Sequence, residues 1–256
     1  MPPTPATVEV DFIAPHHLAG GGDPAWVTVP LHRACGWSHG NDPLMPRVLL
    51  SSPDQKTLLR LEPVPDGQWW TLTHAPEPGR PAWYASFGGH TPVELIAAFT
   101  DALTDSAPAD SVSDPYEALA DANWCPVYGR KGIVSPDGTA RIERVVARST
   151  DHWVATTAIG DRTVWQARFG EHTPPRLITA FTTALADRHP VARTDSPHGL
   201  SALTPGLVTR RATEVPAVLV ASALEERVLS LAARHSAPGP AQRPAQPAPP
   251  ANGRSR

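Results

Sequence analysis

A block of 23 residues occurs twice in this chain, and this repetition constrains the fold more than any other feature of the sequence. Residues 83–105 read WYASFGGHTPVELIAAFTDALTD, and residues 165–187 read WQARFGEHTPPRLITAFTTALAD. The two blocks agree at 15 of 23 positions without a gap. Unrelated blocks of ordinary composition would share about one or two residues. The chain therefore contains two copies of one structural unit.

The similarity continues upstream of this block. Ser52-Pro53-Asp54 corresponds to Ser135-Pro136-Asp137, and three tryptophan pairs are equivalent, namely Trp37 with Trp124, Trp70 with Trp153 and Trp83 with Trp165. We divide the chain into a leader with one strand (1–22), repeat 1 (23–105), a linker (106–113), repeat 2 (114–187), a second linker (188–205), a helical segment (206–235) and a tail (236–256). The tail is rich in Pro and Ala, which predicts disorder.

Each repeat has the pattern of an antiparallel β-meander closed by a C-terminal helix, which predicts an α+β fold. The Ser-Pro-Asp motif is typical of a hairpin turn. Apolar residues alternate after it, so we expect Trp83, Ala85 and Phe87 to face the core. Thr91-Pro92 predicts a helix N-cap and first residue, and Glu94 fits a capping box.

Two segments outside the repeats also have periodic patterns. Val8, Val10 and Phe12 alternate with polar residues, which predicts a strand in the leader. Residues 217–234 can form a helix with one apolar face, made of Val220, Leu224, Val228 and Leu231.

Composition excludes several classes of protein. The net charge of −3 provides no global positive field for nucleic acid or an anionic membrane. No run approaches eighteen apolar residues, and the first residues lack a signal-peptide pattern, so we expect no membrane span and no secretion. The two cysteines, Cys35 and Cys125, fit a reducing compartment. We therefore expect a cytoplasmic protein without a metal or cofactor.

The Ser-Pro-Asp turns, the paired tryptophans and the two His-Thr-Pro helix starts resemble one family. It is the actinobacterial domain of unknown function named after a Ser-Pro-Asp-Tyr motif, common in streptomycetes and often duplicated. The segments HLAGGGDP at 17–24 and CGW at 35–37 are also similar to it, and the resemblance covers residues 8–187. Both copies depart from the motif at its Tyr, with Gln55 and Gly138. The resemblance implies an actinobacterial, cytoplasmic protein of unassigned function.

Short motifs that could carry chemistry have simpler structural interpretations. Gly36-Trp37-Ser38-His39-Gly40 matches a nucleophile elbow, but turn residues follow where that motif needs a helix. His90 and His172 are equivalent and could act in acid–base or metal chemistry, although packing beside the helix start explains them better. Asp54 and Asp137 could form a symmetric carboxylate pair, but an Asp in a turn normally binds its own backbone.

The cysteines and a glycine run have equally plain interpretations. We interpret Cys35 and Cys125 as small apolar groups rather than reactive thiols. Gly20-Gly21-Gly22 lacks the spacing and the Lys of a phosphate-binding loop, and it reads as a flexible leader. We therefore assign no catalytic residue, no cofactor-binding residue and no metal ligand.

One surface of repeat 1 is more apolar than its counterpart. If Trp70 and Trp83 face inward, Trp69 and Tyr84 face outward, and Leu58 joins them from a neighbouring strand. The corresponding residues of repeat 2 are polar, namely His152, Gln166 and Arg141. An open aromatic face would bind a partner. We expect instead that this face is covered, with the C-terminal helix as the first choice and repeat 2 as the other.

Three functions remain open on this evidence. The first is a non-catalytic module that binds a protein or another macromolecule. The second is an enzyme with its site in the cleft between the repeats, where polar side chains would break the internal symmetry. The third is nucleic-acid binding through a basic stripe, which the acidic Glu143 argues against; the stripe comprises Arg130, Lys131, Arg141 and Arg144.

Overall fold

The structure is a computed structural model, and it describes residues 6–41, 47–64, 67–105, 114–147, 150–194 and 206–236. The linker expected over 106–113 lies outside these residues. The tail lies outside them too, except for Ser236, which ends a helix.

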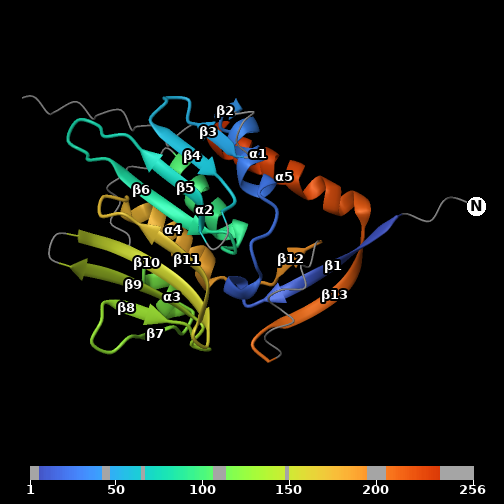
Figure 1. Cartoon of the computed structure of the whole chain (residues 1–256). Helices are drawn as coiled ribbons and strands as arrows, with labels where there is room; N and C mark the ends of the chain where they lie inside the picture. The colour runs from blue at the N-terminus through green and yellow to red at the C-terminus, as the bar shows by residue number, and fades with distance from the viewer. Residues whose placement is uncertain are drawn as a thin grey trace, which may run out of the picture.

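One antiparallel sheet of ten strands, to which both repeats contribute, forms the centre of the molecule (Figure 1). Repeat 1 supplies β2 (Ser38–Asn41), β3 (Val48–Ser51), β4 (Thr57–Leu61), β5 (Gln68–His74) and β6 (Trp83–Gly88). Repeat 2 supplies β7 (Cys125–Pro126), β8 (Gly132–Val134), β9 (Ala140–Ala147), β10 (Thr150–Ile159) and β11 (Arg162–Phe169). Strands β6 and β11 pair antiparallel at the junction, so the strand order of one half mirrors that of the other.

Equivalent residues occupy equivalent positions in the two halves. In repeat 1, His74 lies opposite both Thr57 and Trp83. In repeat 2, Thr157 lies opposite both Ala140 and Trp165. The predicted equivalence of Trp83 with Trp165 is confirmed, because the cross-strand register reproduces it independently of the alignment.

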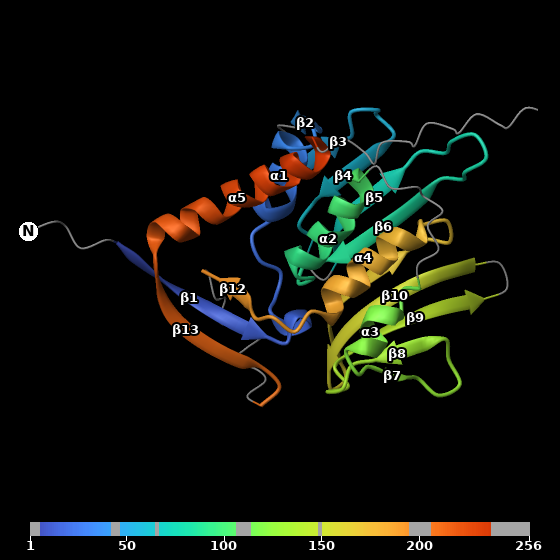
Figure 2. The ribbon, with the colours of Figure 1, turned by 180° about the vertical axis from the view of Figure 1, so that it is seen from behind.

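Helices α2 (Val93–Thr104) and α4 (Pro175–Ala186) lie side by side on one face of the sheet (Figure 2). Four phenylalanines, each fully buried, meet between the helices and the junction of the two halves. Phe87 stacks on Phe181 with ring centroids 6.0 Å apart, and Phe169 stacks on Phe99 at 5.6 Å. A single core thus joins the two repeats. The expected inward orientation of Trp83, Ala85 and Phe87 is also confirmed, since all three are buried.

Shorter helices stand at the start of each repeat. These are α1 (Ala25–Arg33) and α3 (Glu117–Asp121). Among the described helices, none combines the length and the apolar character needed to cross a bilayer.

A second, three-stranded sheet stands beside the first. Its central strand is β1 (Thr7–Ala14), which pairs with β12 (Val191–Arg193) and β13 (Thr209–Pro216). The 3-10 helix η1 (His16–Leu18) leads from β1 towards repeat 2. Sequence patterns did not predict β12 and β13, because β13 is largely exposed and both are defined by pairing with a strand far away in the chain.

The C-terminal helix α5 (Ala217–Ser236) forms where a helix is expected, but its predicted position is wrong. It packs against α1 rather than over Leu58 and Tyr84, which are 42% and 47% exposed. Arg227 and Arg234 of α5 both pair with Asp101 of α2, at 2.9 and 2.8 Å. These ion pairs and the buried Val228 and Leu231 hold α5 on the helical side of the sheet.

The predicted capping box is also wrong. Pro92 occupies the N-cap of α2, no side chain caps the helix, and the hydroxyl of Thr91 is buried without a described partner. The Glu94 carboxylate turns instead to Arg193, with oxygen–nitrogen distances of 2.6 and 2.9 Å. A long-range ion pair therefore replaces the local cap.

Candidate functional site

The two Ser-Pro-Asp motifs form identical hairpin turns. The Ser52 hydroxyl donates to Asp54 Oδ1 at 2.5 Å and accepts from the Thr57 amide at 2.9 Å. The same contacts recur at residues 135–140. The fourth position of each turn, Gln55 or Gly138, has a φ of 62° or 72°, which glycine adopts without strain. The motif therefore acts as turn chemistry in both copies.

The turns do not bring Asp54 and Asp137 together. Strands β4 and β9, which carry the turns, are separated by four other strands. At about 4.8 Å per strand the two carboxylates lie more than about 20 Å apart, so they form no catalytic pair.

The chain's own leader fills one corner of repeat 2, beside the second turn. The Trp165 indole donates to the His17 carbonyl at 2.8 Å, and the His17 ring packs edge-on against Trp124. Nε2 of His17 lies 2.7 Å from the Thr139 hydroxyl and 3.4 Å from Asp137 Oδ2. Burial alone would raise the pKa of Asp137, but the contacts with His17 and Ser135 hold that pKa well below its usual range.

The rest of the leader packs on the start of α2. The Val93 amide donates to the Gly21 carbonyl at 2.7 Å. A Cβ on Gly21 would lie 2.6 Å from the Gly89 carbonyl oxygen, so only glycine fits there. The expectation of a flexible Gly20-Gly21-Gly22 segment is therefore wrong, because these glycines permit close backbone packing. We call this assembly, in which residues 16–22 lie against repeat 2 and the start of α2 of repeat 1, the filled corner.

Arg193 of β12 fastens the filled corner. Its guanidinium binds the Glu94 carboxylate and donates to the carbonyls of Ala19 and Gly20. Nε2 of His16 lies 3.8 Å from Glu94, which is an ion-pair distance and too long for a hydrogen bond. Burial alone would raise the pKa of Glu94, but His16 and Arg193 lower it to about 2.

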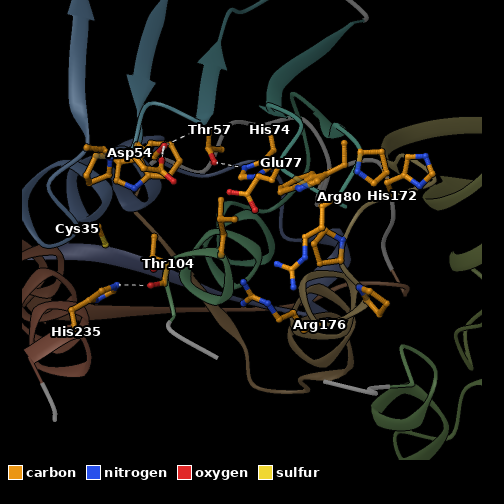
Figure 3. A pocket seen from close by; sticks show the side chains of 18 residues that line it. Cys35, Asp54, Thr57, His74, Glu77, Arg80, Thr104, His172, Arg176 and His235 are labelled. Carbon is orange, nitrogen blue, oxygen red and sulfur yellow. Dashed lines mark hydrogen bonds between the residues drawn. The ribbon is translucent and has the colours of Figure 1, made fainter. Parts of the chain in front are cut away.

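The equivalent corner of repeat 1 is a pocket of about 620 Å³ (Figure 3). We call it the open corner. The leader is held in the filled corner by Trp124, Asp137, Trp165, Val93 and Glu94. The residues at the equivalent positions, in the same order, all line this pocket: Trp37, Asp54, Trp83, Pro175 and Arg176. Because Pro175 and Arg176 belong to α4, the pocket lies between the repeats. A second hollow beside Asp137 involves none of these tryptophans.

Polar side chains in the open corner depart from the internal symmetry. His74 replaces Thr157, stacks on Trp83 with ring centroids 5.2 Å apart, and lies 2.8 Å from the Thr57 hydroxyl. Lys56 pairs with Glu77 at 2.5 Å on the same side of the pocket.

The other side of the open corner is positively charged. Figure 3 shows the guanidinium groups of Arg80 and Arg176 pointing toward one another. Burial and the proximity of Arg80 lower the pKa of Arg176, whereas the negative charge of Asp105 raises it by a smaller amount than burial lowers it. His172 and its equivalent His90 are both exposed, and only His172 lines this pocket.

Neither cysteine nor the elbow motif forms a reactive centre. Ser38 begins an antiparallel strand, and its hydroxyl lies 3.4 Å from the Ser51 carbonyl, so the strand–turn–helix context of an elbow is missing. Cys35 lines the open corner, but burial raises its pKa. Cys125 is exposed on β7. Among the described residues, no three His, Cys, Asp or Glu side chains are placed to hold a metal ion.

The apolar face of repeat 1 divides into two places. Leu58 and Tyr84 lie in one cross-strand row, with Thr73 between them. Trp69 lies four residues from Thr73 along β5, or about 13 Å. Its ring packs against Gly89, and its indole donates to the Val64 carbonyl at 2.8 Å. The structure therefore brings Leu58 and Tyr84 together but not Trp69.

The basic stripe considered for nucleic acid is largely neutralised. Arg130 and Arg141 both lie within ion-pair distance of Glu143. Arg144 binds Asp151 with two nitrogens. These pairings leave little positive charge for a phosphate backbone.

His17 and Arg193 are the main residues that sequence reasoning missed. Neither belongs to a repeat, so the internal comparison could not select them. The run Gly20-Gly21-Gly22 was the available signal, since consecutive glycines also mark close approach of two backbones.

The fold and the two corners define a tandem-repeat α+β protein with one self-filled and one open copy of the same site. A family model, SPDY, described as a domain of unknown function (DUF317), matches residues 51–109 and 134–191. The two matches are consistent with a tandem duplication of this domain, and the resemblance seen in the sequence is confirmed. Neither a curated protein nor a solved structure matches the chain.

Proposed function

We propose that the protein is a binding module for a short segment of polypeptide, and that the open corner is its binding site. The filled corner is the observation that supports this proposal. There, the equivalent corner accommodates residues 16–22, which form one turn of 3-10 helix followed by glycines, two of them with positive φ.

In this proposal each repeat is an antiparallel meander closed by its C-terminal helix, and each binding unit combines the meander of one repeat with the start of the other repeat's helix. Repeat 2 uses its unit internally to hold the leader, and repeat 1 keeps its unit for a partner. The pocket combines two aromatic rings, Trp37 and Trp83, with hydrogen-bonding groups at Asp54, Thr57 and His74. Its volume is typical of ligand sites, which measure roughly 300–1,000 Å³.

Selection of displayed ten-residue peptides against the full chain tests this proposal. We expect the selected peptides to lose at least about tenfold in affinity when Thr104→Trp places an indole in the pocket, because the bulk excludes the ligand. Val146→Trp is the matched control, since Val146 is 62% exposed on β9 and does not line the pocket. Thermal unfolding verifies that both variants fold. Equal binding by both variants, or the absence of any selected peptide, contradicts the proposal.

An enzyme with its site in the same pocket is the second candidate. Thr57 and His74 favour it, because a hydroxyl 2.8 Å from an imidazole is the geometry of a nucleophile and its base, and repeat 2 has Ala140 and Thr157 there. Mass spectrometry of the selected peptides after incubation separates the two functions. A binding module returns them intact. A cleaved or modified peptide whose formation is lost in His74→Gln supports the enzyme.

A further inference from the structure

The two corners carry opposite charges at one equivalent position. Glu94 is the second residue of α2 and Arg176 is the second residue of α4, and both face the corner where their helix begins. A ligand that suits one corner therefore mismatches the other at this position. Because a cation neutralises Glu94, we expect an anion to neutralise Arg176.

Arg193 neutralises Glu94 in the filled corner. Its guanidinium binds both carboxylate oxygens, and the imidazole of the leader residue His16 lies 3.8 Å away. Arg193 is buried, so this charge pairing takes place largely away from water. Such pairs are specific because an uncompensated buried charge is costly.

Arg176 is less completely neutralised than Glu94, because the opposing charge of Asp105 acts on it without forming an ion pair. It is half-buried, and one of its guanidinium nitrogens donates to the Ala102 carbonyl, while its Nε is buried without a hydrogen-bond partner among the described residues. It forms no salt bridge with any described carboxylate. A desolvated guanidinium beside a second arginine favours a bound anion, and its planar donors suit a carboxylate.

We propose that the ligand of the open corner is an acidic peptide segment, with a carboxylate side chain at the position that His16 occupies in the leader. This inference rests on the proposed binding function. The carboxylate pairs with Arg176, while the following residue lies against Asp54 and Trp83, as His17 lies against Asp137 and Trp165. The ligand thus resembles the leader in backbone and differs from it in charge at one residue.

Two labelled peptides test the proposal by fluorescence anisotropy with the full chain. The first is leader residues 14–23, APHHLAGGGD, and the second is the same peptide with His16→Glu. We expect the chain to bind the substituted peptide at least about tenfold more tightly, because a carboxylate that matches the charge of Arg176 replaces an imidazole.

The chain variant Arg176→Glu should reverse this preference, because it restores the charge of the filled corner. Arg176→Gln should abolish the preference without reversing it. Arg168→Glu is the control, since Arg168 is exposed on β11 outside the pocket and the change in net charge is the same. Thermal unfolding midpoints establish that all three variants fold.

The outcomes separate this proposal from the binding function. If Arg168→Glu weakens binding of the acidic peptide as much as Arg176→Glu does, the effect is general electrostatics and the proposal fails. If library-selected peptides bind in the pocket but are not acidic, the binding function stands and the charge assignment is wrong. If no peptide binds, both are wrong.

Discussion

The filled and open corners are two versions of one site, built by the same strands, turn and helix contact. In repeat 2, the leader occupies the site and contacts Thr139, Asp137 and Trp165. In repeat 1, the equivalent groups line a pocket of about 620 Å³. The difference teaches that two equivalent sites in a duplicated fold can diverge, one holding the chain's own leader and the other holding no described segment.

The largest expected contrast concerns the two arginines of the corners. Arg193→Met should lower the free energy of unfolding by about 3–5 kcal/mol, because it leaves the Glu94 carboxylate buried without its partner. Arg176→Met should cost about 1 kcal/mol or less, since it removes one hydrogen bond to a carbonyl. Urea denaturation measures both. A similar loss of unfolding free energy in the two variants would contradict the view that only Arg193 stabilises a buried carboxylate.

Glu94 should make the filled corner sensitive to acid. Its pKa is lowered from 4.5 to about 2, so its contribution to stability is complete above pH 4.5 and is lost as the pH falls towards 2. At pH 7, Glu94→Gln should lower the free energy of unfolding by about 3 kcal/mol, because Arg193 loses its charged partner.

Urea denaturation at pH 7, 4 and 3 measures this dependence. The difference in stability between the wild type and Glu94→Gln should shrink as the pH falls through this window. Parallel curves for the two proteins would show that Glu94 does not carry the acid sensitivity.

Close packing of the leader should make Gly21 intolerant of a side chain. Gly21→Ala should cost about 2 kcal/mol, because its Cβ would meet the Gly89 carbonyl oxygen at 2.6 Å and backbone cannot easily move. Gly40→Ala is the control, since its Cβ would make only ordinary contacts, and it should change stability by about 0.5 kcal/mol or less. Calorimetry compares them, and equal unfolding midpoints would argue that the leader is loosely held.

The smallest expected contrast lies in the two turns. Asp54→Asn and Asp137→Asn should each cost about 1 kcal/mol through the shared turn contacts. Asp137→Asn should cost a few tenths of a kcal/mol more, because only Asp137 faces the buried His17. Chemical denaturation in the His17→Gln background should remove this extra cost, whereas an unchanged difference would place its origin in the turn itself.

The repeated block allowed much of the fold to be predicted, since it fixed which residues are equivalent and which face the core. Trp83, Ala85 and Phe87 are buried because alternation in two copies identifies one face of a strand. Helix caps were harder to predict. Thr91 and Glu94 fit the local capping motif, but Glu94 binds the distant Arg193 instead. The predicted position of α5 was also wrong. Ion pairs with Asp101 hold this helix, and the pattern of apolar residues gives no information about ion pairs.

The sequence by itself determined the duplication, the two identical turns and the strand and helix of each core face, because all of these follow from local pattern. Only the tertiary structure decided that β6 and β11 join ten strands into one sheet, and that the leader enters one corner while no described segment fills the other. The position of the leader depends on contacts between distant residues, such as the hydrogen bond from Trp165 to His17, which are 148 residues apart. Periodicity cannot encode such contacts, since they arise only when separate segments are packed together.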